Sequence, residues 1–199
     1  MGKTSREDIL DVAERRFSER GFDATSLGDI ADEVGVRSPS LYKHFTNKEE
    51  MFVAVLERLL DPYFDILHRI LDVPMDQDQA AENLRTVLRF YFRSPNLARL
   101  LQHVALAGGP HAVLVEERWF IPFFARAAEL SETIPYIKGR DPSELMLLVI
   151  AFHNMIVGYI TLSPLTGKLV GGDPLSPIAI ERQEDFMINM ARSFWQSTS

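Results

Sequence analysis

Residues 25 to 48 read TSLGDIADEVGVRSPSLYKHFTNK, and this stretch decides the fold of the amino-terminal part of the chain. Apolar residues repeat with helical spacing over its first half, at Leu27, Ile30, Ala31 and Val34. Ser26 and Asp29 form a capping-box pattern at the start of that repeat. Gly35 follows it, where a helix commonly ends in the left-handed conformation. The pattern predicts a short helix between Ser26 and Gly35.

A second short helix is expected to begin at Ser38, with Pro39 at its first position, where the missing amide of proline costs nothing. Leu41 and Phe45 are four residues apart and therefore face the same side, which we expect to be the core. Val36 is a single apolar residue between the helices and should pack between them. Two short helices around a glycine turn are typical of helix-turn-helix geometry.

Charge distinguishes this stretch from the rest of the chain. Residues 34 to 48 hold Arg37, Lys43 and Lys48 and no Asp or Glu, whereas the whole chain has a net charge of −7. A protein that coats nucleic acid without sequence preference is expected to be basic throughout. Any DNA contact of this chain is therefore expected to be confined to one face, with repulsion elsewhere.

Helical patterns continue on both sides of this stretch. A first helix should run from a cap at Thr4 or Ser5 to Arg20 and stop at Gly21. A long helix should start at Asn47, and Pro62 should kink or end it and act as a hinge. Further helices are expected near residues 77 to 93, 96 to 107, 111 to 131, 142 to 163 and 176 to 196. No alternating strand pattern of useful length appears, so the predicted fold is all-α.

Residues 5 to 60 resemble the DNA-binding domain of the TetR-type (tetracycline-repressor-like) transcription regulators. The residues that carry the resemblance are Ile9, Ala13, Phe17, Gly21-Phe22, Thr25, Ile30-Ala31, Gly35-Val36, Leu41-Tyr42, His44-Phe45 and Lys48-Glu49-Glu50. The resemblance implies about nine helices. It also implies a DNA-binding domain over residues 3–63 and a domain for ligand binding and dimerisation over residues 64–199.

The resemblance places the second short helix in the major groove of double-stranded DNA, with Pro39 in its first turn. Base-edge contacts are then expected from Arg37, Ser38, Ser40 and Lys43. Phosphate contacts are expected from Thr25, Ser26, Tyr42, His44 and Lys48. His44 fits a packing role equally well. Gly28 has no side chain, so a contact that some relatives make from that position is missing here.

Two apolar helices suggest a second copy of the chain as a partner. Residues 145–162 carry no charge, and we interpret them as a helix buried on nearly all sides rather than a membrane span, since His153 and Asn154 lie at their centre. The last helix is amphipathic and either packs on its own domain or pairs with the partner. The resemblance implies a homodimer on a palindromic operator. The expected interface residues are Phe152, Met155, Phe186, Met190 and Phe194.

Aromatic residues gather in the middle of the chain, together with a few polar ones. Aromatic walls with few polar groups suit a small, mostly apolar effector molecule, although such residues at helical spacing are also usual in a plain core. The residues expected to line an effector site are His103, Trp119, Phe123, Phe152, His153 and Tyr159. Phe120-Ile121-Pro122 is interpreted as a helix kink that opens space there.

Other functions find little support. Cysteine is absent, and His103, His111 and His153 form no i, i+4 pair, so neither a metal site nor a cofactor is expected. There is no nucleophile-elbow motif or Gly-rich phosphate loop, so we predict no enzyme. No apolar signal stretch begins the sequence, which favours the cytoplasm. The predicted function is a ligand-released repressor. The alternative is a helical small-molecule-binding protein or enzyme whose head no longer reads DNA.

Overall fold

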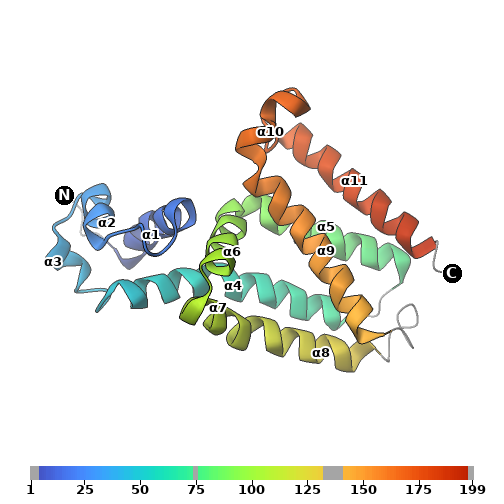
Figure 1. Cartoon of the computed structure of the whole chain (residues 1–199), viewed down its shortest axis with the longest axis horizontal. Helices are drawn as coiled ribbons and strands as arrows, with labels where there is room; N and C mark the ends of the chain where they lie inside the picture. The colour runs from blue at the N-terminus through green and yellow to red at the C-terminus, as the bar shows by residue number, and fades with distance from the viewer. Residues whose placement is uncertain (1–4, 74–75, 132–140, 197–199) are drawn as a thin grey trace.

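The computed structural model describes residues 5–73, 76–131 and 141–196, and every regular element in these ranges is a helix. This confirms the predicted all-α fold. Figure 1 shows a small unit of α1 to α3 at one end of the molecule and a larger unit of α5 to α11 at the other, with α4 running from one into the other. We call α1 to α3 and the first turns of α4 the head, and the rest the core domain. The helices are α1 (Arg6–Arg20), α2 (Leu27–Val34), α3 (Ser38–Leu41), α4 (Lys48–Leu71), α5 (Gln77–Arg93), α6 (Pro95–Ala107), α7 (Gly109–Val115), the π-helical turn η1 (Glu116–Phe120), α8 (Ile121–Ser131), α9 (Pro142–Thr161), α10 (Ser163–Val170) and α11 (Pro177–Gln196).

Hydroxyl–carboxylate caps fix the helix starts of the head. Ser5 and Ser26 cap α1 and α2, and each forms a full capping box with the Asp three residues later. Gly35 ends α2 in the left-handed conformation, with φ 78° and ψ 30°. These three predicted boundaries are confirmed. They set the angle between α2 and α3 because the turn between them has only three residues.

The buried side chains of the head form one end of a hydrophobic core that continues into the core domain. Phe17, Ile30, Leu41 and Phe45 are almost fully buried, and the ring of Phe52 meets that of Phe17 edge-on at 5.0 Å between centroids. Burial of each such side chain contributes about 1.5–3 kcal/mol. Arg58 of α4 adds ion pairs to the acids on the outer face of α1, namely Glu7, Asp11 and Glu14.

Helix α4 does not end at Pro62, which excludes one of the two predicted outcomes, an end or a kink at the proline. The helix continues to Leu71, so the predicted domain boundary after residue 63 lies inside it. The residues on both sides of Pro62 are buried, including Leu59, Leu60, Tyr63 and Phe64. Their burial keeps the helix continuous although proline removes one backbone hydrogen bond.

Four acidic side chains of α4 are held by donors on α7, η1 and α8. Glu49 meets His111 at 2.8 Å, Glu57 meets Arg118 at 2.6 Å, and Asp61 accepts from Trp119 Nε1 at 2.8 Å. A fourth pair joins Asp72 to Arg126. Because these pairs lie on both sides of Pro62, α7, η1 and α8 hold α4 in place before and after the proline. In this structure α4 passes through Pro62 as one helix.

The core domain differs from the sequence prediction in two helices. The predicted helix 111–131 is divided among α7, η1 and α8, and the π-helical turn ends at Phe120, the first residue of the predicted Phe120-Ile121-Pro122 kink. Helix α10 was not predicted, since Pro164, Gly167 and Gly171 resemble loop punctuation. The last helix packs on α5, where buried Glu184 is bound by Arg85 at 3.2 Å and Arg89 at 3.4 Å.

We expect Gly21→Ala to destabilise the protein by about 1–3 kcal/mol, because a side chain at φ 78° and ψ 176° is strained. An added Cβ would also lie 3.1 Å from His103 Nδ1. Urea unfolding measures the loss. Gly28→Ala is the matched control: it lies in α2, its Cβ would meet only Ser26 Oγ at 3.5 Å, and it should be neutral or stabilising. Equal effects of the two variants would contradict this account.

The caps of the head predict a loss of stability in acid. Hydrogen bonds from Ser5, Ser26 and Thr46 lower the pKa values of Asp8, Asp29 and Glu50 below their ordinary values of 3.8, 3.8 and 4.5. Because the folded-state pKa is the lower one, this stability is complete above the ordinary values and disappears as the pH falls through the folded ones.

The urea midpoint should therefore fall as the pH is lowered from 6 to about 3. Asp29→Asn should show a smaller fall, since it lacks one of the three carboxylates. Asp32→Asn, an exposed position on the same helix that makes no cap, serves as the control and should keep the wild-type fall. Identical pH profiles for the two variants would argue against the caps as the cause.

Candidate nucleic-acid interface

Helix α3 lies at the end of the head that is remote from the core domain (Figure 1). Its regular part is only Ser38–Leu41, shorter than the predicted 38–45. Helical turns continue beyond it, because His44 N and Phe45 N both donate to Leu41 O, at 2.9 and 3.0 Å. The backbone therefore continues in helical turns from Ser38 to Phe45.

The two sides of α3 have opposite characters. Leu41 and Phe45 are anchored in the head core, as predicted. Among the expected base-contacting residues, Arg37, Ser38 and Lys43 are exposed and Ser40 is half-buried, and Pro39 is exposed beside them. Tyr42 presents 56% of its surface. Within the described residues neither Arg37 nor Lys43 pairs with a carboxylate, so both cations are free to meet an anion.

The expected phosphate contact of Thr25 needs correction. Thr25 is only 1% exposed, and its hydroxyl donates to Gly21 O at 2.8 Å. The hydroxyl therefore closes the turn after α1 instead of facing solvent. Ser26 is exposed but also serves the fold, since its Oγ accepts from Asp29 N and lies 2.7 Å from the Asp29 carboxylate.

The remaining expected phosphate residues lie around the start of α4. His44 is half-buried, an exposure that suits packing and contact alike. Lys48 is the first residue of α4, after the Asn47 cap, and its ammonium lies 4.1 Å from the centroid of the Phe22 ring. The ring holds the lysine near the amino end of α4, where free amides and the helix dipole favour an anion.

The residues expected to bind an effector lie in three separate places. His103 of α6 lies against Gly21 at the boundary with the head. Tyr159 of α9 donates to Pro174 O at 2.8 Å, at the start of the α11 segment. The other four, which are Trp119, Phe123, Phe152 and His153, belong to the main apolar core or pack against it. The six do not surround one site in this structure.

A short row of polar groups crosses that apolar core. Tyr91 is fully buried, its hydroxyl lies 3.1 Å from His153 Nδ1, and its ring meets that of Tyr63 at 5.1 Å. Burial raises the pKa of Tyr63 to about 12, raises that of Tyr91 and lowers that of His153. All three groups are therefore neutral near pH 7. Close by on α4, His68 Nδ1 is buried without a hydrogen-bond partner.

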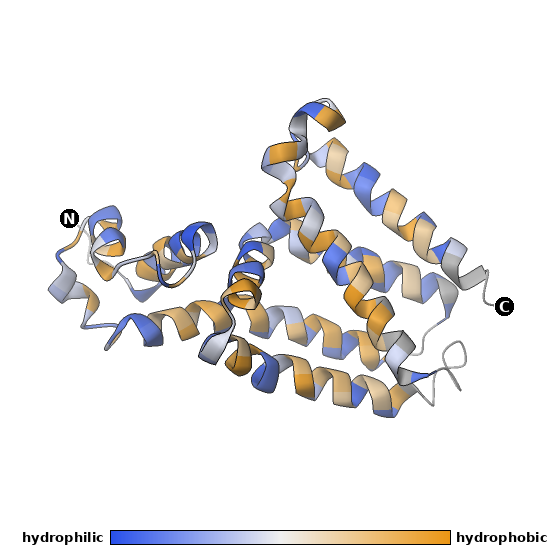
Figure 2. Cartoon of the chain, viewed as in Figure 1, coloured by the Kyte–Doolittle hydropathy of each residue, from blue (hydrophilic) through white to orange (hydrophobic). Residues whose placement is uncertain are grey.

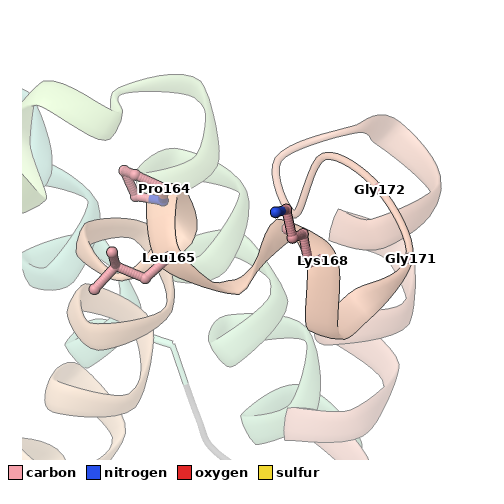
Figure 3. A pocket seen from close by; sticks show the side chains of 6 residues that line it. Pro164, Leu165, Lys168, Gly171 and Gly172 are labelled. Atoms are coloured by element: carbon pink, nitrogen blue, oxygen red, sulfur yellow. The ribbon is translucent and has the colours of Figure 1, made fainter.

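A groove of the described surface lies elsewhere. It has a volume of about 660 Å³ and lies beside α10, where Figure 3 shows Pro164, Leu165 and Lys168 around it. Gly167, Gly171 and Gly172 complete its lining. None of the residues expected to bind an effector contributes to it.

Helix α9 is buried on one side and exposed on the other, so its expected burial on nearly all sides stays a prediction that requires the second copy of the chain. Met146, Leu147, Val149 and Ile150 are exposed, whereas Ile156, Val157 and Ile160 are buried in the core domain. Figure 2 shows the apolar character of α9 along most of its length. A single copy of the chain therefore leaves an apolar stripe on α9 uncovered.

The expected dimer residues divide between surface and core. Phe186 of α11 is 61% exposed, Met190 is half-buried, and the side chain of Phe194 lies outside the described residues. Phe152 and Met155 of α9 are half-buried and pack against the core. The inner side of α11, with Met187 and Ala191, faces its own domain.

Metal-ligand clusters and membrane-spanning helices are two further features to consider in the described residues. No group of three or more His, Asp or Glu side chains there is arranged to hold a metal ion. No single helix there is long and apolar enough to cross a bilayer, although Val149–Thr161 and Ser163–Val170, bent by 81°, pass that test as a pair.

Comparison with known proteins places the head in a family. Residues 9–55 match the model of bacterial regulatory proteins of the tetR family. The HTH-type transcriptional repressor KstR2 of Rhodococcus jostii is 41% identical over 86 residues, 43% of this chain and 42% of that protein. The icaADBC negative transcriptional regulator IcaR of Staphylococcus epidermidis is 28% identical over 154 residues, 76% of this chain and 78% of that protein. KstR2 and two further curated relatives are matched over less than half of their own length.

The fold of the whole chain agrees with this match. A TetR-family transcriptional regulator from Bordetella parapertussis superposes with a TM-score of 0.70 at 16% identity, over 94% of this chain and 93% of that one. At this identity the likeness concerns the fold alone. The exposed α3, the match over the head and the shared fold lead to one conclusion: residues 9–55 are similar to the bacterial regulatory proteins of the tetR family, and most of the chain shares the fold of solved TetR-family regulators.

Proposed function

We propose that the chain is a sequence-specific DNA-binding regulator of transcription that reads double-stranded DNA with α3. The observation that carries this proposal is the α3 surface, which presents Arg37 and Lys43 without carboxylate partners on a chain of net charge −7. Arginine and lysine suit the guanine acceptors of the major groove, and Ser38 and Ser40 can donate or accept. The similarity of the head to the tetR family supports a regulatory protein rather than an enzyme in this proposal.

The regulator works as a homodimer in this proposal. The exposed stripe on α9 and exposed Phe186 on α11 are apolar surfaces that water disfavours. A symmetric pair of copies can cover both, because a two-fold interface places the same patch on each side. Two heads then face the two half-sites of a palindromic operator. One α3 offers few base contacts, so specificity requires both.

The core domain is proposed to bind a small, mostly apolar effector. The row of Tyr63, Tyr91 and His153 supports this, because it places neutral polar groups inside an aromatic core. His68 Nδ1 adds a buried polar atom without a partner. A neutral or weakly basic compound with one hydrogen-bonding group suits these residues better than a charged one, since burial disfavours charge.

Release of DNA follows from the connections of α4. Effector binding near residues 90 to 125 changes the packing of η1 and α8, which hold α4 through Arg118, Trp119 and Arg126. A displacement of α4 moves the head and changes the spacing of the two α3 helices. Because effector and DNA favour different states, each weakens the binding of the other by the same factor. We propose that this regulator represses its targets in the cytoplasm.

The DNA proposal is tested with a gel shift on a fragment of the chain's own upstream promoter. Arg37→Ala combined with Lys43→Ala should weaken the specific complex at least about tenfold, since each good base contact contributes about 1–3 kcal/mol of discrimination. An unrelated duplex of equal length should change less. Arg93→Ala, an exposed arginine at the end of α5 and outside the proposed dimer interface, is the matched control and should bind as the wild type does.

Lys48→Ala should behave differently from the α3 variants. It is expected to weaken binding to both duplexes alike and to reduce the salt slope by about 1, because it removes one phosphate contact. Failure of the double α3 variant to alter the specific complex would exclude α3 as the reading element. It would favour the alternative, a helical small-molecule-binding protein whose head no longer reads DNA.

The dimer proposal is tested by sedimentation velocity. The wild type should sediment as a dimer at micromolar concentration. Leu147→Glu with Ile150→Glu should produce monomers, because two charges would be buried in the proposed interface without partners. Leu106→Glu on α6, a position that is 79% exposed and outside that interface, should stay dimeric. A monomeric wild type, or a dimeric double variant, would refute the proposed interface.

A further inference from the structure

Two histidines of the core domain lie against the turn that follows α1 in the head. His103 of α6 approaches Gly21 so closely that a Cβ there would lie 3.1 Å from its Nδ1. His111 of α7 lies beside the next residue, with its ring centroid 4.5 Å from that of Phe22 and 4.6 Å from that of Phe52. Head and core domain therefore meet at places other than along α4.

His111 also reaches the first turn of α4. Its Nε2 lies 2.8 Å from Glu49 Oε1, a pair that joins residues 62 positions apart in the chain. The His111 side chain is only 17% exposed, so the bond is partly sheltered from water. Glu49 follows Lys48 directly in the sequence. The Lys48 ammonium lies over the Phe22 ring, and the His111 ring contacts that same Phe22 ring.

We propose that His111 is a positioning residue for the DNA interface. From α7 it fixes, through Glu49 and Phe22, the end of α4 that carries Lys48. This inference rests on the proposed DNA binding and adds a second route from core domain to head. In the proposed mechanism of DNA release, a displacement of α4 moves the head with it. Through His111, a movement of α7 reaches the phosphate-facing end of α4 directly.

The neighbouring contacts explain why α7 can transmit such a movement. Immediately after α7, the π-helical turn η1 places the adjacent residues Arg118 and Trp119 against Glu57 and Asp61 of α4. The wider turn lets two consecutive side chains reach acids that are four positions apart. Any change in η1 therefore alters both the middle of α4 and, through α7 and His111, its beginning. Isolated π-turns are frequent at functional sites.

A double-mutant cycle on operator affinity measures the contact. His111→Ala should weaken DNA binding roughly threefold to tenfold, because neighbouring partners usually couple by about that factor. Glu49→Ala removes a negative charge near the DNA phosphates, so this variant alone also gains some DNA affinity from reduced repulsion. The cycle removes that contribution. In the Glu49→Ala background, His111→Ala should weaken binding at least about threefold less than in the wild type.

A conservative variant separates the hydrogen bond from simple packing. His111→Gln keeps a donor for Glu49 but loses the ring, so it should restore a large part of the affinity. Glu82→Ala, which cuts the ion pair with Arg85 within α5 and involves no ion pair to α4 among the described residues, is the matched control and should change affinity less than about twofold. Circular dichroism melting verifies that each variant is folded.

Hydrogen exchange tests the same contact without DNA. In His111→Ala the amides of residues 21–26 and 44–50 should exchange at least several-fold faster, while those of α8 should not change. An additive cycle, or unchanged exchange around residues 21–26 and 44–50, would overturn the proposal. If the wild type bound no DNA specifically, the proposed function would fail, and the exchange result would still decide whether His111 holds this end of α4.

Discussion

The burial of one helix in both the head and the core domain is the constraint on which the rest of this structure depends. Helix α4 places Phe52 among the aromatic rings of the head and Tyr63 and Phe64 among those of the core domain. Each side chain of this size contributes about 1.5–3 kcal/mol when buried. The head therefore cannot turn independently of α4 without exposing apolar surface, and α4 cannot turn without disturbing the core domain.

Polar pairs fix the position of α4 relative to the helices that pack against it. The acids of α4 meet donors on α7, η1 and α8 along almost its whole length, from Glu49 to Asp72. Exposed pairs of this kind contribute little stability individually, typically below about 1 kcal/mol. Their geometry matters more, since each fixes where one turn of α4 lies against its neighbour. In the proposed function, a small effector acts on the head by shifting the neighbours of α4.

Local features of the fold were predictable from the sequence because they depend on residues a few positions apart. The Ser26–Asp29 box, the left-handed Gly35 and the buried pair Leu41 and Phe45 are of this kind. The general location of the DNA-facing residues followed from them. Thr25 was misjudged, because its hydroxyl bonds with a carbonyl that only the folded turn brings near.

The features that were missed depend on distant residues. Pro62 suggested a hinge, but burial on both sides keeps α4 intact. Helix α10 was hidden by its glycines and proline. His111 was considered only as a possible metal ligand, since nothing in its neighbourhood in the sequence points to Glu49, 62 residues away. Helical periodicity indicates that a residue is buried or exposed, but it does not identify the partner across an interface.

The continuity of α4 is the central claim, and residue-resolved hydrogen exchange along residues 48–71 tests it most directly. One helix held from both sides should open as a unit, so amides before and after Pro62 should show similar protection, apart from the turn that lacks a hydrogen bond at the proline. A step in protection at Pro62, with one half of the helix exchanging much faster than the other, would contradict it and restore the hinge.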